Sequence, residues 1–93
     1  MSIPNIELLN DTHTFPGQYT VKVIGEQDPC FASRIVSVVQ EELKWKSEPA
    51  YSVRKSETGK HQAVTLELTV ENAEEVHFVY KRLVDLPGVL LLL

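Results

Sequence analysis

Cysteine is almost absent from this 93-residue chain, and so is any long apolar run. The one cysteine, Cys30, excludes a disulfide within the chain and fits a reducing compartment such as the cytoplasm. The only long apolar run, Val89–Leu93, is far too short to span a bilayer. The first residues lack a basic stretch followed by an apolar run, so we expect no signal peptide and no membrane association.

Positive charge is also scarce, with nine Lys and Arg residues against thirteen Asp and Glu residues and a net charge of -4. A phosphate backbone would be repelled by this balance. The outward positions of the expected sheet carry no aromatic side chain on which a base could stack. We therefore expect no nucleic-acid partner.

Sets of residues that carry catalysis or bind metals are missing as well. The three histidines, His13, His61 and His77, show no ligand-like spacing, which argues against a metal site. The loop Gly25–Asp28 is acidic and has no Arg, so it does not suit the phosphate-binding loop of an acylphosphatase. No Ser-His-Asp or Cys-His set is indicated, and we expect a protein that is not an enzyme and needs no cofactor.

The clearest pattern that is present is the alternation over His61–Val70. Val64, Leu66, Leu68 and Val70 fall on one face, which predicts a strand with one buried and one solvated side. The other elements are expected on either side of this strand. They are a strand at 18–24, a helix from Asp28 to about Trp45, a strand at 50–56, a helix after Asn72 and a strand at 89–93.

This β-α-β-β-α-β order predicts an α+β, ferredoxin-like sandwich. Right-handed crossovers give an antiparallel sheet in the order 4-1-3-2, with both helices on one face. Residues 18–93 form the single domain. Residues 1–17 form an N-terminal extension in which Asn5 caps one helical turn.

Three local expectations follow from the same pattern. Asp28 is predicted to be the N-cap of the first long helix, with Pro29 at its first position. Tyr51 and Val53 are predicted to point inward from the second strand. Gly59 supplies the positive φ of a hairpin turn, and Asn72 with Glu75 forms a capping box.

Several stretches resemble the YbeD-like family: Thr14–Gly25, the hairpin Lys55–His61, Val70–Val76 and Leu86–Val89. The resemblance covers most of the chain from residue 14 and implies a ferredoxin-like fold similar to ACT domains, which are small regulatory modules that bind amino acids. The family has no known function and has also been labelled a regulator related to lipoic acid. The chain departs from the family at His61, where Tyr is usual. It also lacks the Gly of the Asp-x-Pro-Gly motif of ACT domains.

Two groups of residues are candidates for ligand binding. Gly25, Asp28 and Cys30 belong to a loop that leads into a helix N-terminus, where an anion is favoured, although Asp28 supplies like charge and also suits a capping role. Cys30 is either a reactive thiol or a small apolar filler under the helix. The second group is basic: Lys22, Arg54, Lys55 and Lys60 could gather on or near the open sheet face and the hairpin, and His61 lies next to Lys60. Surface charge that serves solubility is the alternative.

The resulting hypothesis is a small, ACT-like regulatory or binding module that acts by self-association and by binding a small ligand. A homodimer is expected because the last strand is an edge that is apolar on both faces. Within the chain, Ile6–Leu9 is the other segment that could cover this edge. The alternative function is a protein-interaction adaptor with no small ligand.

Overall fold

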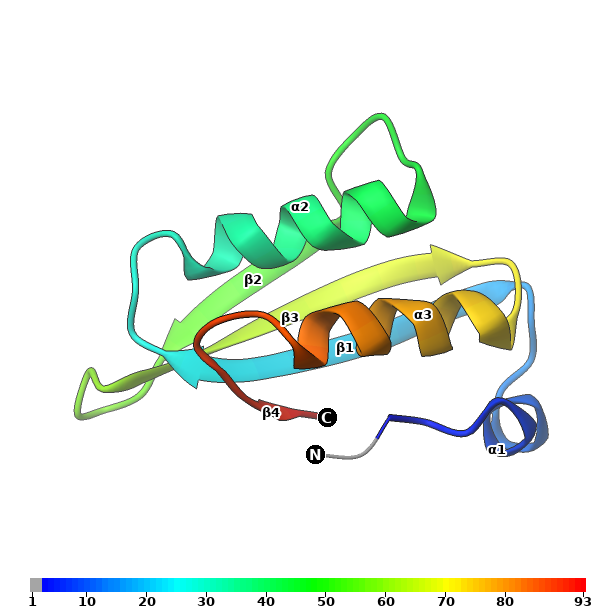
Figure 1. Cartoon of the computed structure of the whole chain (residues 1–93), viewed down its shortest axis with the longest axis horizontal. Coiled ribbons are helices and arrows are strands. Elements are labelled where there is room, and N and C mark those ends of the chain that lie inside the picture. The colour runs from blue at the N-terminus through cyan, green and yellow to red at the C-terminus, as the bar shows by residue number, and fades with distance from the viewer. Residues whose placement is uncertain (1–2) are drawn as a thin grey trace.

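A four-stranded antiparallel sheet with two helices on one face forms the body of the protein (Figure 1). The computed structural model describes residues 3–93. Its strands follow the order β2-β3-β1-β4, which is the predicted order 4-1-3-2 read from the other edge. The elements are α1 (Ile6–Thr12), β1 (Gly17–Glu26), α2 (Phe31–Leu43), β2 (Ala50–Lys55), β3 (His61–Val70), α3 (Ala73–Val84) and β4 (Val89–Leu92). The ferredoxin-like α+β architecture is confirmed.

The core lies between the helices and the apolar face of β3 and β1. In the ladder between these strands, Val21 is opposite Leu66 and Val23 is opposite Val64, as the period of two predicted. Glu67 is exposed and Thr65 is only partly buried, so the predicted register is confirmed. All ten predicted core residues are buried: Val21, Val23, Ile35, Val39, Val64, Leu66, Leu68, Val76, Val79 and Leu83.

Helix α2 begins later than the sequence indicated. Its first helical residue is Phe31 and its N-cap is Cys30, so the predictions of Asp28 as the N-cap and of Pro29 as the first helical residue were wrong. Asp28 instead forms a turn ahead of the helix, in which its carboxylate accepts a hydrogen bond from the Cys30 N–H at 2.9 Å. The turn keeps Asp28 at the start of the helix but outside it.

Helix α3 has the predicted cap. The Asn72 side chain accepts from the Glu75 N–H at 3.0 Å. The Glu75 carboxylate reaches back one residue further than a capping box requires, to the N–H of Glu71 at 2.6 Å. The turn before β3 is also as predicted, because Gly59 has a φ of 73°.

Strand β2 differs from its predicted environment. Tyr51 and Val53 lie opposite Leu66 and Val64, so their side chains belong to the helix-bearing face. Both are 44% exposed, however, and the prediction that they point into the core was wrong. They are exposed because β2 is the outer strand and the helices cover mainly the central strands. The result is an apolar margin beside α2.

The N-terminal helix α1 is longer than one turn and packs beside α3 (Figure 1). Asn5 caps it by accepting from the N–H groups of Glu7 and Leu8. Leu9 is 3% exposed and joins the main core. The His77 ring, on α3, is hydrogen-bonded to the carbonyl oxygen of Pro4 at 2.9 Å, which fixes the segment before α1.

Candidate functional site

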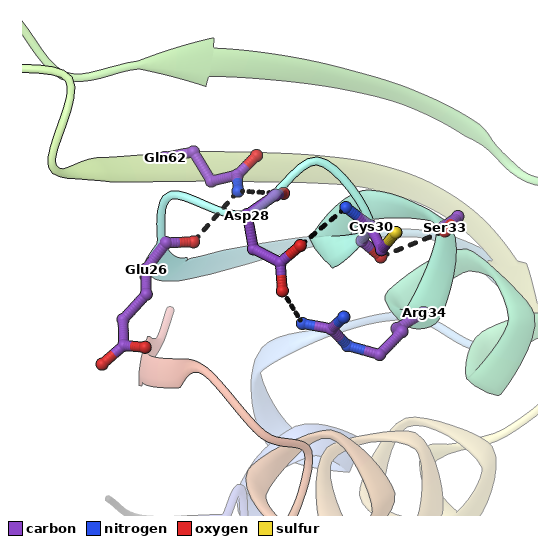
Figure 2. A network of polar contacts seen from close by, with 6 residues as sticks. All are labelled: Glu26, Asp28, Cys30, Ser33, Arg34 and Gln62. Atoms are coloured by element: carbon purple, nitrogen blue, oxygen red, sulfur yellow. Dashed lines mark hydrogen bonds and ion pairs between the residues drawn. The ribbon is translucent and has the colours of Figure 1, made fainter.

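The loop between β1 and α2 is held by a network of polar contacts around Asp28 (Figure 2). One carboxylate oxygen of Asp28 accepts from the Cys30 N–H, and the other accepts from the Arg34 guanidinium at 2.9 Å. The hydrogen bond from the Cys30 N–H, followed by that from Arg34, lowers the pKa of Asp28 from its ordinary value of 3.8. The carboxylate therefore stays ionised at neutral pH and ties the loop to the first turn of α2.

Gln62, on β3, anchors the same loop, as Figure 2 shows. Among residues 3–93 it is the one buried polar residue, and it is only 4% exposed. Its side-chain amide donates to the carbonyl oxygens of Glu26 and Asp28, each at 3.0 Å. These two carbonyls would otherwise need another donor near the core, so a polar side chain is required at this position.

Gly25 completes the packing of the loop. A Cβ at this position would overlap the Phe31 ring and lie 2.6 Å from the carbonyl oxygen of Gly88. Only a glycine lets Phe31, which is 1% exposed, close over the strand. Gly25 is therefore explained by packing.

The three predicted loop residues were Gly25, Asp28 and Cys30. Gly25 packs against Phe31 and Asp28 bonds to Arg34, so both have structural roles, and a ligand role for any of the three stays a prediction. The Asp28 carboxylate already lies at the start of α2, where an anionic ligand would be placed, and it would repel one. Cys30 is exposed, so the interpretation as a buried apolar filler was wrong. Arg34 and Gln62 were not predicted. The sequence did contain a signal that Gln62 is buried, because it alternates in phase with the core residues Val64 and Leu66.

Arg54 and His61, from the second predicted group, come together on the helix-free face of the sheet. They line a shallow basin of about 320 Å³. Its floor is Ala63 and Ile24, which are opposite each other on β3 and β1. Ala63 is flanked on its other side by β2, where Arg54 lies directly opposite it. The basin exists because the short Ala63 side chain lies between longer neighbours.

The rim of the basin is mainly cationic. Lys22 and Arg54 line it together with a single carboxylate, Glu57. Lys55 also lines it, but it is opposite Gln62 and therefore has the side-chain direction of the helix-bearing face. Within residues 3–93 none of these three cations forms an ion pair. Lys60 lies at the base of the hairpin, where its carbonyl oxygen accepts from the Gln27 N–H at 3.1 Å, and its side chain does not line the basin. The structure thus brings Arg54 and His61 together and leaves Lys60 outside.

A second feature is the apolar edge formed by β4. Leu92 is buried under the helices, whereas Leu90, Leu91 and Leu93 are 48%, 43% and 58% exposed. Helix α1 packs on α3 and leaves these three leucines exposed. Since Leu91 and Leu93 pair with Ile24 and Lys22, they extend the open sheet face at its edge.

Other kinds of site are not seen in the described part of the chain. Among residues 3–93, no cluster of three His, Cys, Asp or Glu side chains has a geometry for a metal ion. No helix in the same range is long and apolar enough to cross a membrane.

Comparison with known proteins places these features in a family. Residues 10–93 match a family described as "Protein of unknown function (DUF493)". A UPF0250 protein of Shewanella woodyi is 32% identical over 75 residues, which are 81% of this chain and 83% of the relative. A UPF0250 protein of Shewanella frigidimarina is 35% identical over the same shares. One of Yersinia pestis is 30% identical over 78 residues, or 84% and 87% of the two chains. The match spans the sheet, the Asp28 loop and the basin, and it confirms the YbeD-like resemblance: the chain belongs to the DUF493 family of proteins of unknown function.

Proposed function

We propose that this protein is a small, non-enzymatic, ACT-like regulatory module that forms a homodimer through β4 and binds a small ligand. The observation that carries the proposal is the exposure of Leu90, Leu91 and Leu93 on an edge strand without a charged residue. An apolar edge with free backbone groups pairs readily with another strand. The single cysteine fits a cytoplasmic location.

The hydrogen-bond pattern of β4 defines how a second copy would pair. Leu93 exchanges both backbone hydrogen bonds with Lys22, at 2.8 and 3.1 Å. Because these groups alternate in direction along an antiparallel strand, those of Leu90 and Leu92 point to the free edge. A two-fold axis beside Leu91 sets Leu90 of one copy opposite Leu92 of the other. The two Leu91 side chains then face each other on the open side of the sheet.

The opposite edge, β2, is less suited to this role. It carries Arg54 and Lys55 in its last two positions, and charged side chains protect an edge strand from pairing. Strand β4 has no such protection. The charge distribution therefore favours β4 over β2 as the dimer edge.

Two matched substitutions test the interface. Leu91 and Val53 are 43% and 44% exposed on opposite edges. Sedimentation equilibrium at about 50 μM is expected to give a dimer for the wild type and for Val53→Lys. Leu91→Lys is expected to give a monomer, since two like charges would face each other. A monomeric wild type refutes self-association, and dissociation by Val53→Lys alone moves the interface to β2.

The second candidate function is an adaptor that binds another protein and no small ligand. It is supported by a groove of about 560 Å³ along α2, lined by Val36, Gln40 and the loop 46–48. A thermal-shift screen with amino acids, lipoate and nucleotides separates the two functions. A specific rise in melting temperature supports the ligand-binding module. No shift with any compound supports the adaptor.

A further inference from the structure

We infer that the basin on the open sheet face binds a small carboxylate that carries an apolar group. This inference deepens the proposed ligand-binding function and does not depend on self-association. The residues that carry it lie on β1, β2 and β3, and all of their positions are fixed by the sheet register.

The first argument is the shape and chemistry of the floor. Ala63 and Ile24 form an apolar base between the polar side chains of the neighbouring strand positions, and the volume of about 320 Å³ suits a small molecule. No Phe, Tyr or Trp lines the basin, so a nucleobase would lack a large aromatic stacking surface there. A fully hydrated anion such as inorganic phosphate gains nothing from an apolar base. The floor therefore selects a ligand with a hydrocarbon part.

The second argument is the arrangement of charge. Arg54 is directly opposite Ala63, while Lys22 is opposite Thr65, the next outward residue on β3. The two cations therefore flank the apolar base from the two neighbouring strands. An Arg guanidinium binds a carboxylate through two parallel hydrogen bonds, and Lys adds a point charge. One carboxylate group would meet both, with its hydrocarbon part over Ala63.

The acidic residues nearby do not neutralise the two cations. Glu67 accepts a hydrogen bond from the Thr20 hydroxyl at 2.8 Å, and Glu26 is opposite His61 beyond the floor. Glu57 alone lines the basin as a carboxylate, and it belongs to the hairpin turn. In a chain with a net charge of -4, this local excess of positive charge favours an anionic ligand.

The test is a titration followed by ¹H–¹⁵N NMR, with 3-phenylpropionate, 3-phenylpropanol and acetate as probes. We expect 3-phenylpropionate to shift the amide signals of Ile24, Arg54 and Ala63, with an affinity at least about tenfold above that of either other probe. Equal binding of the alcohol would show that charge is not recognised, and equal binding of acetate would show that the apolar floor is not used. Either result overturns the inference.

Variants test the location of the site. Arg54→Gln is expected to weaken binding of 3-phenylpropionate by about tenfold, and Ala63→Leu, which fills the hollow, is expected to abolish it. Lys44→Gln is the control, because it removes one exposed positive charge just after α2, outside the basin. An equal loss in Lys44→Gln, or no loss in Arg54→Gln and Ala63→Leu, refutes the site. A monomer that binds the probe disproves only the homodimer, and a dimer that binds none of the probes disproves only this inference.

Discussion

The side-chain amide of Gln62 lies 3.0 Å from the carbonyl oxygen of Asp28, although 34 residues separate them in the chain. The same amide donates to Glu26, so one buried side chain joins the end of β1 and the loop before α2 to β3. The loop conformation that places Asp28 beside Arg34 therefore depends on a residue of the central strand.

Replacing Gln62 by Leu should lower the free energy of unfolding by about 1–3 kcal/mol. The apolar side chain fits the core, but the carbonyl oxygens of Glu26 and Asp28 lose their donor. Urea denaturation measures the loss, and Gln18→Leu on the exposed face of β1 is the control. Equal stability of the Gln62→Leu and Gln18→Leu proteins would show that the two hydrogen bonds are unimportant for stability.

The sequence predicted the fold well because its strongest signal lies on the central strand. The alternation over His61–Val70 fixes the face and register of β3, and β1 and both helices then have only one apolar surface to cover. This is why the strand order and all ten core residues could be predicted. The turn residues Gly59 and Asn72 supplied local constraints that agreed with the same arrangement.

The misses have a common physical cause, which is that burial depends on neighbours that are remote in sequence. Tyr51 and Val53 have the inward phase, but periodicity does not show how far a helix extends over an outer strand. The start of α2 depends on Gln62 and Arg34, which hold the turn at Asp28. The basin around Ala63 depends on the pairing of three strands, so its basic residues and His61 could be predicted, but its apolar floor of Ala63 and Ile24 could not.

Leu66→Ala should cost about 2–5 kcal/mol of unfolding free energy, since Leu66 is fully buried on the central strand. Val53→Ala, on the neighbouring strand with the same side-chain direction, should cost less than about 0.5 kcal/mol because the side chain is exposed. Thermal or urea unfolding of both variants compares them directly. Similar losses for the two proteins would contradict the observed difference in burial.

The lowered pKa of Asp28 predicts a pH dependence of stability. The Asp28 carboxylate stabilises the folded state fully above its unfolded-state pKa of about 3.8. This stabilisation is lost as the pH falls through the lower pKa of the folded state. Asp28→Asn keeps an oxygen acceptor for the Cys30 N–H but loses the charge that faces Arg34. The difference in stability between wild type and Asp28→Asn should therefore be constant near neutral pH and should shrink below pH 3.8.

Asp85→Asn is the control for this experiment, because Asp85 is exposed and forms no ion pair within residues 3–93. Urea unfolding at a series of pH values measures both differences. If the difference between wild type and Asp28→Asn stays unchanged below pH 3.8, the Asp28 carboxylate does not stabilise the folded state through its charge.

Gly25→Ala should destabilise the protein by about 1–3 kcal/mol, because the added methyl group overlaps the Phe31 ring and the Gly88 carbonyl. If the ring is the main obstacle, Phe31→Leu should make room, and the double variant should be more stable than the sum of the two single losses predicts. A coupling of at least about 0.5 kcal/mol in a double-mutant cycle, measured by urea unfolding, is the expected result. Strict additivity would assign the clash to the Gly88 backbone alone. A Gly25→Ala protein as stable as the wild type would show that Phe31 does not pack against this strand.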